Sequence, residues 1–141
     1  MGLLSYAAKF AVKPRGKAEE AIFAHIWEQT PVESVLQALL DSEVLLFSQN
    51  PAGAVPGGGD PKPLVTEGSG GQPAMLVFTT RERSASIAKQ MPDPSAAPLT
   101  MPFREVLRWA PAELGLIVNM GTALMAEATA AQMSALREKM T

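Results

Sequence analysis

One segment limits what this chain can fold into: between Pro51 and Pro73, glycine and proline fill 12 of 23 positions. Ordering glycine costs more backbone entropy than ordering any other residue, and proline lacks the N–H that a helix or a sheet uses. Regular structure must therefore lie on either side of a long loop. We expect this loop, residues 51–73, to be flexible.

Two helices are predicted before the loop. Apolar side chains recur at helical spacing over residues 17–28, which is typical of an amphipathic helix. A second helix is expected to follow Thr30, because Thr30 and Glu33 have the spacing of a capping box and Pro31 suits the first helical position. Apolar residues at i, i+3, i+4 and i+7 continue this helix until about Ser42.

The other elements are predicted from short apolar runs and from further capping-box patterns. Apolar runs bounded by turn residues are typical of buried strands. They predict strands at Val44–Ser48, Met75–Thr79 and Leu114–Val118. Within the loop only Leu64–Thr66 could form a strand, and if it does, it should pair with Met75–Thr79 as an antiparallel hairpin. Helices are predicted at about 81–90, 102–110 and 129–140, the first opened by Thr79 with Glu82 and the last by Thr129 with Gln132.

The order of these elements predicts the fold class. Helices and strands alternate without a strict βαβ order, which favours an α+β (mixed α/β) fold with a small mixed sheet of about 4–5 strands packed against helices. A length of 141 residues with 47% hydrophobic and 18% charged residues suits a single folded domain over residues 1–141. We expect Met75, Met125 and Met133 in its core.

Charge and hydropathy limit the kinds of partner and the cellular compartment that we expect for this chain. Basic residues gather in an amino-terminal arm, residues 1–16, which we interpret as solvated, and the whole chain carries a formal charge of −2. This charge is too small and of the wrong sign to neutralise many phosphates. No apolar run approaches the length of a membrane span and no export signal is visible. We therefore expect a cytoplasmic protein that binds neither nucleic acid nor a membrane.

The residues that usually carry enzyme chemistry are scarce. The chain has no cysteine and one histidine, His25, which we interpret as a residue at the surface or at a helix boundary. Gly53 and Gly58 have the spacing of a phosphate-binding loop, but the lysine that such a loop requires is missing. The neighbouring acids Glu19 and Glu20 read as solvated helix surface. We predict no catalytic residue, no metal and no cofactor.

Three polar residues are candidates for a binding site. Arg81 and Arg83 follow a buried strand at a helix start, and Asn119 follows another apolar strand. Strand ends and helix amino termini often meet at ligand sites, so these side chains could bind an anion or a small ligand. The alternative is structural: the arginines would be exposed charges, and the Asn119 amide would bond nearby backbone groups and fix the turn before Gly121.

The sequence resembles the amino-terminal domain of the SseB family, named for enhanced serine sensitivity. Members carry a strand and turn similar to Leu76–Glu82, and a later apolar strand that runs into N-P-G, which is similar to Gly115–Gly121 with Met120 in place of the proline. The pattern at Val32–Phe47 is also similar, so the resemblance covers roughly residues 30–140. It implies a small cytoplasmic bacterial α/β domain and carries over no catalytic residue.

Two functional hypotheses follow. The leading one is a non-catalytic protein-interaction or regulatory module, with a protein partner or a second copy of the chain as its ligand. The alternative is a small-ligand or anion-binding protein, or an enzyme, with its site at Arg81, Arg83 and Asn119.

Overall fold

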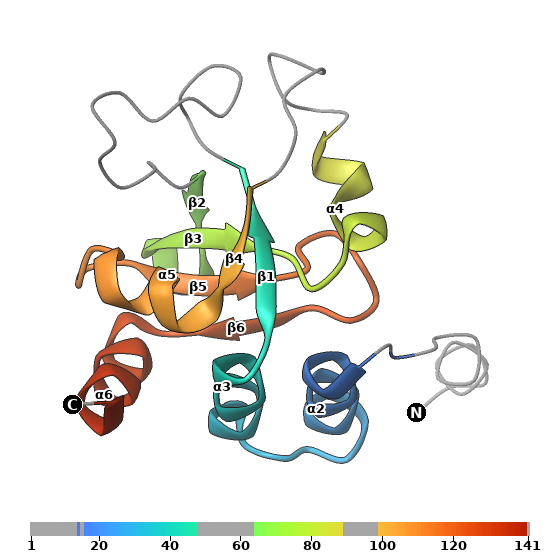
Figure 1. Cartoon of the computed structure of the whole chain (residues 1–141), viewed down its shortest axis with the longest axis horizontal. Coiled ribbons are helices and arrows are strands. Elements are labelled where there is room, and N and C mark those ends of the chain that lie inside the picture. Colours follow the sequence, from blue (N-terminus) through green and yellow to red (C-terminus); the bar gives the residue numbers. More distant parts are fainter. Residues whose placement is uncertain (1–13, 15, 48–63, 89–98, 141) are drawn as a thin grey trace.

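The elements of the chain form an α+β fold, as predicted. The structure, a computed structural model, describes residues 14, 16–47, 64–88 and 99–140. Their order along the chain is shown in Figure 1 and is α2 (Gly16–Trp27), α3 (Val32–Leu40), β1 (Glu43–Leu46), β2 (Val65–Glu67), η3 (Ser69–Gly71), β3 (Pro73–Val77), α4 (Arg81–Ala88), β4 (Leu99–Pro102), α5 (Phe103–Trp109), β5 (Gly115–Val118), β6 (Ala126–Ala128) and α6 (Ala130–Met140).

The described strands form two sheets rather than one. The larger has the order β2-β3-β5-β6, in which β3 and β5 are parallel and the outer pairs are antiparallel. The β2–β3 pair is the predicted hairpin. The smaller sheet pairs β1 with β4, and it meets the larger one where Leu45 and Phe78 exchange two backbone hydrogen bonds of 2.8 Å. Strands β4 and β6 were not predicted.

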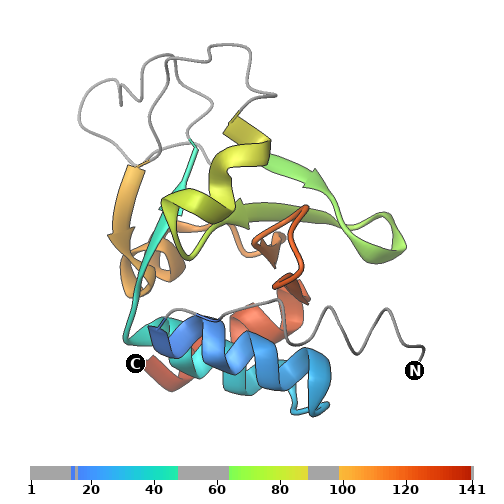
Figure 2. The same ribbon diagram turned by 90° about the vertical axis from the view of Figure 1, so that its right-hand side faces the viewer.

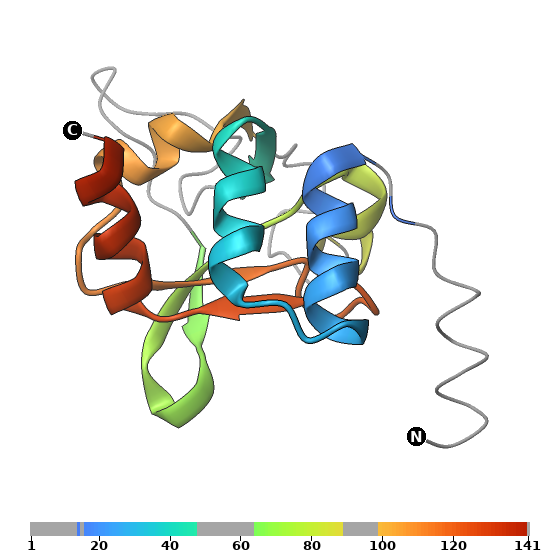
Figure 3. The same ribbon diagram turned by 90° about the horizontal axis from the view of Figure 1, so that it is seen from below.

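Helices α2, α3 and α6 lie side by side against one face of the larger sheet (Figures 2 and 3). The main core lies between this helix layer and the sheet. Its fully buried side chains include Ile22 and Leu39 from the helices, Val77 and Leu116 from the strands, and Met133 from α6. The helical spacing of the apolar residues in α2 and α3 is therefore the pattern that builds this layer.

A second, smaller apolar cluster lies on the opposite face of the sheet. Side chains alternate along a strand, so Met75 and Val77 of β3 join the main core while Leu76 and the following Phe78 join the second cluster. The rings of Phe47 and Phe78 meet edge to face there, with centroids 5.9 Å apart. Burial on both faces explains why the run Met75–Phe78 is apolar throughout rather than alternating.

The start of α3 differs from its prediction, whereas the start of α6 agrees. Pro31 is the N-cap of α3 and no side chain caps it, while the Thr30 carbonyl oxygen lies 2.6 Å from Nδ1 of His25. His25 therefore lies at a helix boundary, as expected. At α6, Thr129 Oγ1 accepts the N–H of Gln132 at 3.1 Å and Gln132 Oε1 accepts the N–H of Thr129 at 2.8 Å, which is the predicted capping box.

Some predictions fall partly on residues outside the described ranges. These include most of the basic arm over 1–16 and residues 51–63 of the Gly/Pro-rich loop, whereas the rest of that loop forms β2, η3 and the first residue of β3. Met75 and Met133 are buried as expected, but Met125 is 46% exposed, so its placement in the core was wrong. Among the described helices, none is long and apolar enough to cross a membrane.

Candidate functional site

Two of the three predicted site residues lie in one hydrogen-bonded network at the ends of the parallel strands. Asn119 follows β5 and is fully buried, and its Oδ1 accepts the backbone N–H of Thr79, just beyond β3, at 2.9 Å. Its Nδ2 donates to the Thr79 hydroxyl, also at 2.9 Å. The Asn119 amide thus does bond a backbone group, but one on the neighbouring strand rather than in its own turn.

The turn after β5 is closed by the backbone of Asn119. The Asn119 carbonyl oxygen accepts the N–H of Thr122 at 3.1 Å and the Thr122 hydroxyl at 2.8 Å. Asn119 has a φ of +57°, in the left-handed region that asparagine tolerates better than most side chains. One residue therefore shapes the turn with its backbone and links two strands with its side chain.

Glu19 completes the network, and the prediction that it lies on the solvated surface was wrong. Its side chain comes from α2, is 0% exposed, and accepts the Thr79 hydroxyl at Oε2 at 2.5 Å. Arg83 reaches both carboxylate oxygens, with Nε 3.3 Å from Oε2 and Nη2 3.3 Å from Oε1. Glu20 is exposed, as predicted. Adjacent helix residues point about 100° apart, so only Glu19 faces the β3–α4 turn.

The two arginines of α4 have different surroundings. The Arg83 side chain is 19% exposed and pairs with Glu19, whereas Arg81 is exposed and takes no part in the network. The N–H of Arg83 is accepted by the hydroxyl of Thr80 at 3.2 Å, so Thr80 caps α4 instead of the predicted Thr79. The Thr79 hydroxyl is used by Glu19. A ligand role for Arg81, Arg83 and Asn119 stays a prediction.

The network leaves little for an anion to bind. The Glu19 carboxylate accepts hydrogen bonds from both Nε and Nη2 of Arg83 and neutralises its charge. Asn119 directs both ends of its amide at Thr79. An incoming phosphate or carboxylate would have to displace a buried carboxylate from its partners. This arrangement holds α2, β3, α4 and β5 together.

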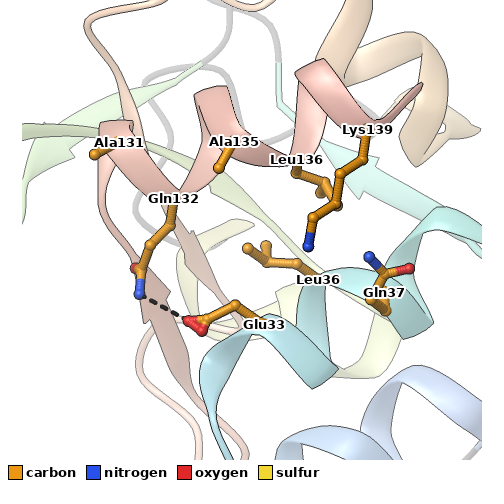
Figure 4. A pocket seen from close by; sticks show the side chains of 8 residues that line it. All are labelled: Glu33, Leu36, Gln37, Ala131, Gln132, Ala135, Leu136 and Lys139. Carbon is orange, nitrogen blue, oxygen red and sulfur yellow. Dashed lines mark hydrogen bonds between the residues drawn. The ribbon is translucent and has the colours of Figure 1, made fainter. Parts of the chain in front are cut away.

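A surface groove between α3 and α6 is the feature that sequence reasoning missed (Figure 4). It has a volume of about 240 Å³. The buried side chains of Leu36 and Leu136 form its apolar floor, and exposed Ala131 and Ala135 border it along α6. Its full lining is Glu33, Leu36, Gln37, Ala131, Gln132, Ala135, Leu136 and Lys139.

The groove carries opposite charges at its two ends. Glu33 lies at one end, where its Oε1 accepts Nε2 of Gln132 at 3.2 Å. Lys139 lies at the other end, beside Gln37 (Figure 4). Lys139 follows Gln132 by seven positions along α6, which at a rise of 1.5 Å per residue is about 10 Å. Because the early residues of both helices meet at one end and the later ones at the other, α3 and α6 run in the same direction.

A second hollow, of about 310 Å³, lies where the β2–β3 hairpin meets β6 and the start of α6. Glu127 of β6 holds the hairpin turn there, because its Oε1 accepts the N–H of Ser69 at 2.7 Å and its Oε2 accepts the Ser69 hydroxyl at 2.5 Å. These two hydrogen bonds hold the pKa of the Glu127 carboxyl below its usual value. Ala131 borders both this hollow and the α3–α6 groove.

A comparison with protein-family models shows that residues 19–135 match the SseB protein N-terminal domain. The chain is a member of the SseB family. The resemblance expected from the sequence is thereby confirmed. Searches among curated proteins and among solved structures gave no match.

The structure explains why two separate sequence motifs carry the SseB resemblance. The motif Leu76–Glu82 contains the end of β3 with Thr79, and the motif Gly115–Gly121 contains β5 with Asn119. The two strands are parallel neighbours, and the Asn119–Thr79 hydrogen bonds join the motifs directly. All four network residues lie within the matched range, whereas Leu136 and Lys139 of the groove lie just beyond it.

The described part of this SseB-family domain shows no group of three or more His, Cys, Asp or Glu side chains placed to hold a metal ion. Its buried polar network is satisfied within the domain, and its α3–α6 groove is apolar with a charge at each end. The first arrangement suits a structural role. The second suits contact with another polypeptide.

Proposed function

We propose that this SseB-family domain is a non-catalytic protein-interaction module that receives an amphipathic helix of a protein partner in the groove between α3 and α6. The observation that carries the proposal is the groove itself, in which an apolar floor of Leu36 and Leu136 lies between Glu33 and Lys139. A volume of about 240 Å³ has room for a bulky apolar side chain. In protein–protein interfaces, the residues that contribute most binding energy are usually bulky side chains that fill a pocket and are surrounded by polar groups.

The direction of the bound helix follows from charge. Two parallel helices present the positive ends of their dipoles together, so a third helix is favoured when it runs antiparallel to them. Its carboxyl-terminal end would then lie near Glu33 and its amino-terminal end near Lys139. Helices favour basic residues at their carboxyl end and acidic residues at their amino end. These are the charges that would pair with Glu33 and Lys139.

The alternative of a ligand site at the strand ends has weaker support. Arg83 is paired with Glu19, and Asn119 is bonded to Thr79, so a ligand there would compete with contacts that the fold already makes. The expected partners remain part of the proposal: a protein, and neither nucleic acid nor a membrane. A cytoplasmic location belongs to it too, supported weakly by the lack of cysteine.

Two synthetic helical peptides of identical composition test the proposal. Both carry a central leucine stripe; one has glutamates at its amino end and lysines at its carboxyl end, and the other has these charges exchanged. Fluorescence anisotropy with the full chain should show the first binding more tightly, by roughly fivefold. A double exchange of Glu33→Lys with Lys139→Glu should invert this preference.

A bulky substitution in the groove provides the matched comparison. Ala135→Arg should abolish binding of the first peptide, because the new side chain lies across the groove. Ala85→Arg makes the same change at an exposed alanine of α4 and should leave binding unchanged. Equal binding of the two peptides, or binding that survives Ala135→Arg, would overturn the proposed site.

A further inference from the structure

We infer that the α3–α6 face packs against the same face of a second copy of this chain, in a two-fold symmetric dimer whose two α6 helices run antiparallel. This inference rests on the proposed function and names its partner. The required partner has an apolar centre, an acidic group at one end, a basic group at the other and an antiparallel direction. The α3–α6 face itself has all four properties when it is turned by 180°.

Symmetry makes the charges of the groove self-complementary. In a two-fold interface the same patch of both copies meets, so that residue i contacts residue j and residue j contacts residue i. With the axis perpendicular to the helices and through the middle of the groove, Glu33 of each copy faces Lys139 of the other. The two ends of the groove are about 10 Å apart along α6, which leaves room for one ion pair on each side of the axis.

The charges are available for such pairs. In the described part of the chain, Glu33 accepts a hydrogen bond from the Gln132 amide and forms no ion pair with Lys139. Both side chains are exposed. An amide partner leaves the carboxylate charge uncompensated, so a lysine from a second copy adds an attraction that the monomer lacks.

Small side chains permit the close approach that the dimer needs. Ala131 and Ala135 are one helical turn apart on α6, and both are exposed. Helix axes can approach to about 8 Å where the contacting side chains are small. The two α6 helices can therefore pack closely against each other, and the apolar floors of Leu36 and Leu136 then face each other across the axis.

Charge-exchange variants of the full chain test the dimer by sedimentation equilibrium. Glu33→Lys places like charges opposite each other across the axis, and Lys139→Glu does the same with the other sign. Each single variant should weaken dimerisation by roughly tenfold or more, and the double variant should return to within about threefold of the original dissociation constant. Recovery in the double variant cannot come from misfolding of the single ones. Raising the salt concentration should weaken the dimer of the original chain.

Glu28→Lys is the control for net charge. It makes the same change in charge as Glu33→Lys at an exposed residue just after α2, and it should leave the dimer unchanged. A dimer that responds equally to Glu28→Lys and Glu33→Lys, or that the double exchange does not restore, would overturn the inference.

The peptides separate this inference from the proposed function. A chain that stays monomeric up to millimolar concentration and still prefers the first peptide overturns the dimer and leaves the interaction module in place, with a different protein supplying the helix. A monomeric chain that binds neither peptide overturns both. A dimer that the first peptide dissociates supports both.

Discussion

The Asn119 side chain links the end of β5 to the backbone of Thr79 beyond the end of β3, with 2.9 Å between Oδ1 and the amide nitrogen. Strand β3 ends at Val77, so the N–H of Thr79 lies beyond the β3–β5 ladder and has no carbonyl of β5 opposite it. The asparagine supplies the missing acceptor. An asparagine at the end of β5 therefore extends the pairing of β3 and β5 by one bond.

We expect Asn119→Ala to lower the free energy of unfolding by about 2–3 kcal/mol, because it leaves the partly buried N–H of Thr79 without its acceptor and places alanine at positive φ. Asn119→Gly loses the same hydrogen bonds but tolerates the backbone conformation, so it should cost less than alanine. Urea unfolding of both variants measures the difference. An alanine variant as stable as the original chain would show that the Asn119–Thr79 link does not stabilise the fold.

Glu19 should be the most sensitive acidic residue of α2. Glu19→Ala removes the carboxylate that neutralises Arg83, and we expect it to cost about 2–3 kcal/mol, somewhat less than for a wholly buried pair because Arg83 reaches water. Glu20→Ala, on the exposed face next to it, should stay within about 0.5 kcal/mol. The melting temperatures of the two variants distinguish these outcomes.

A double-variant cycle tests whether Glu19 acts through Arg83. Replacing both residues with methionine should cost less than the sum of the two single replacements, because no unpaired charge remains. Additive losses would mean that the two side chains stabilise the fold independently.

Local signals in the sequence were sufficient to predict the helices that bury one apolar stripe and the strands that consist of one short apolar run. The apolar spacing of α3 and the runs of β3 and β5 identify those elements without knowledge of their neighbours. Strand β6 has the sequence Ala-Glu-Ala, which has low strand propensity, and it exists because it pairs with β5. Strand β4 likewise depends on pairing with β1, more than fifty residues earlier.

The candidate site could be predicted only in part, because it also depends on contacts between residues that are far apart in the sequence. Asn119 and Arg83 stood out by their place at strand and helix ends. The burial of Glu19 depends on Arg83, which is 64 residues away, so nothing near Glu19 in the sequence distinguishes it from Glu20. The groove exists because α3 and α6 lie next to each other, and neither helix alone reveals it.

Acid should weaken the contact between the hairpin turn and β6. The pKa of Glu127 is lowered in the folded chain by its hydrogen bonds to Ser69, from an ordinary value of 4.5. A lowered pKa means that the contact contributes stability above pH 4.5 and loses it as pH falls through the folded pKa. The difference in unfolding free energy between the original chain and Glu127→Gln should therefore shrink below about pH 4. A difference that is constant down to pH 3 would contradict this assignment.

Two threonines with the same capping-box pattern should respond differently to alanine. Thr129 caps α6, since its hydroxyl accepts the N–H of Gln132, and Thr129→Ala should cost about 1 kcal/mol. Thr30 does not cap α3: in the described part of the chain its hydroxyl accepts the Ser34 hydroxyl at 3.4 Å, and its carbonyl oxygen, which lies 2.6 Å from Nδ1 of His25, is kept in the alanine variant. Thr30→Ala should therefore change stability by less than about 0.5 kcal/mol. Thermal unfolding of the two variants side by side gives the comparison, and equal losses would mean that Thr30 does cap α3 in solution.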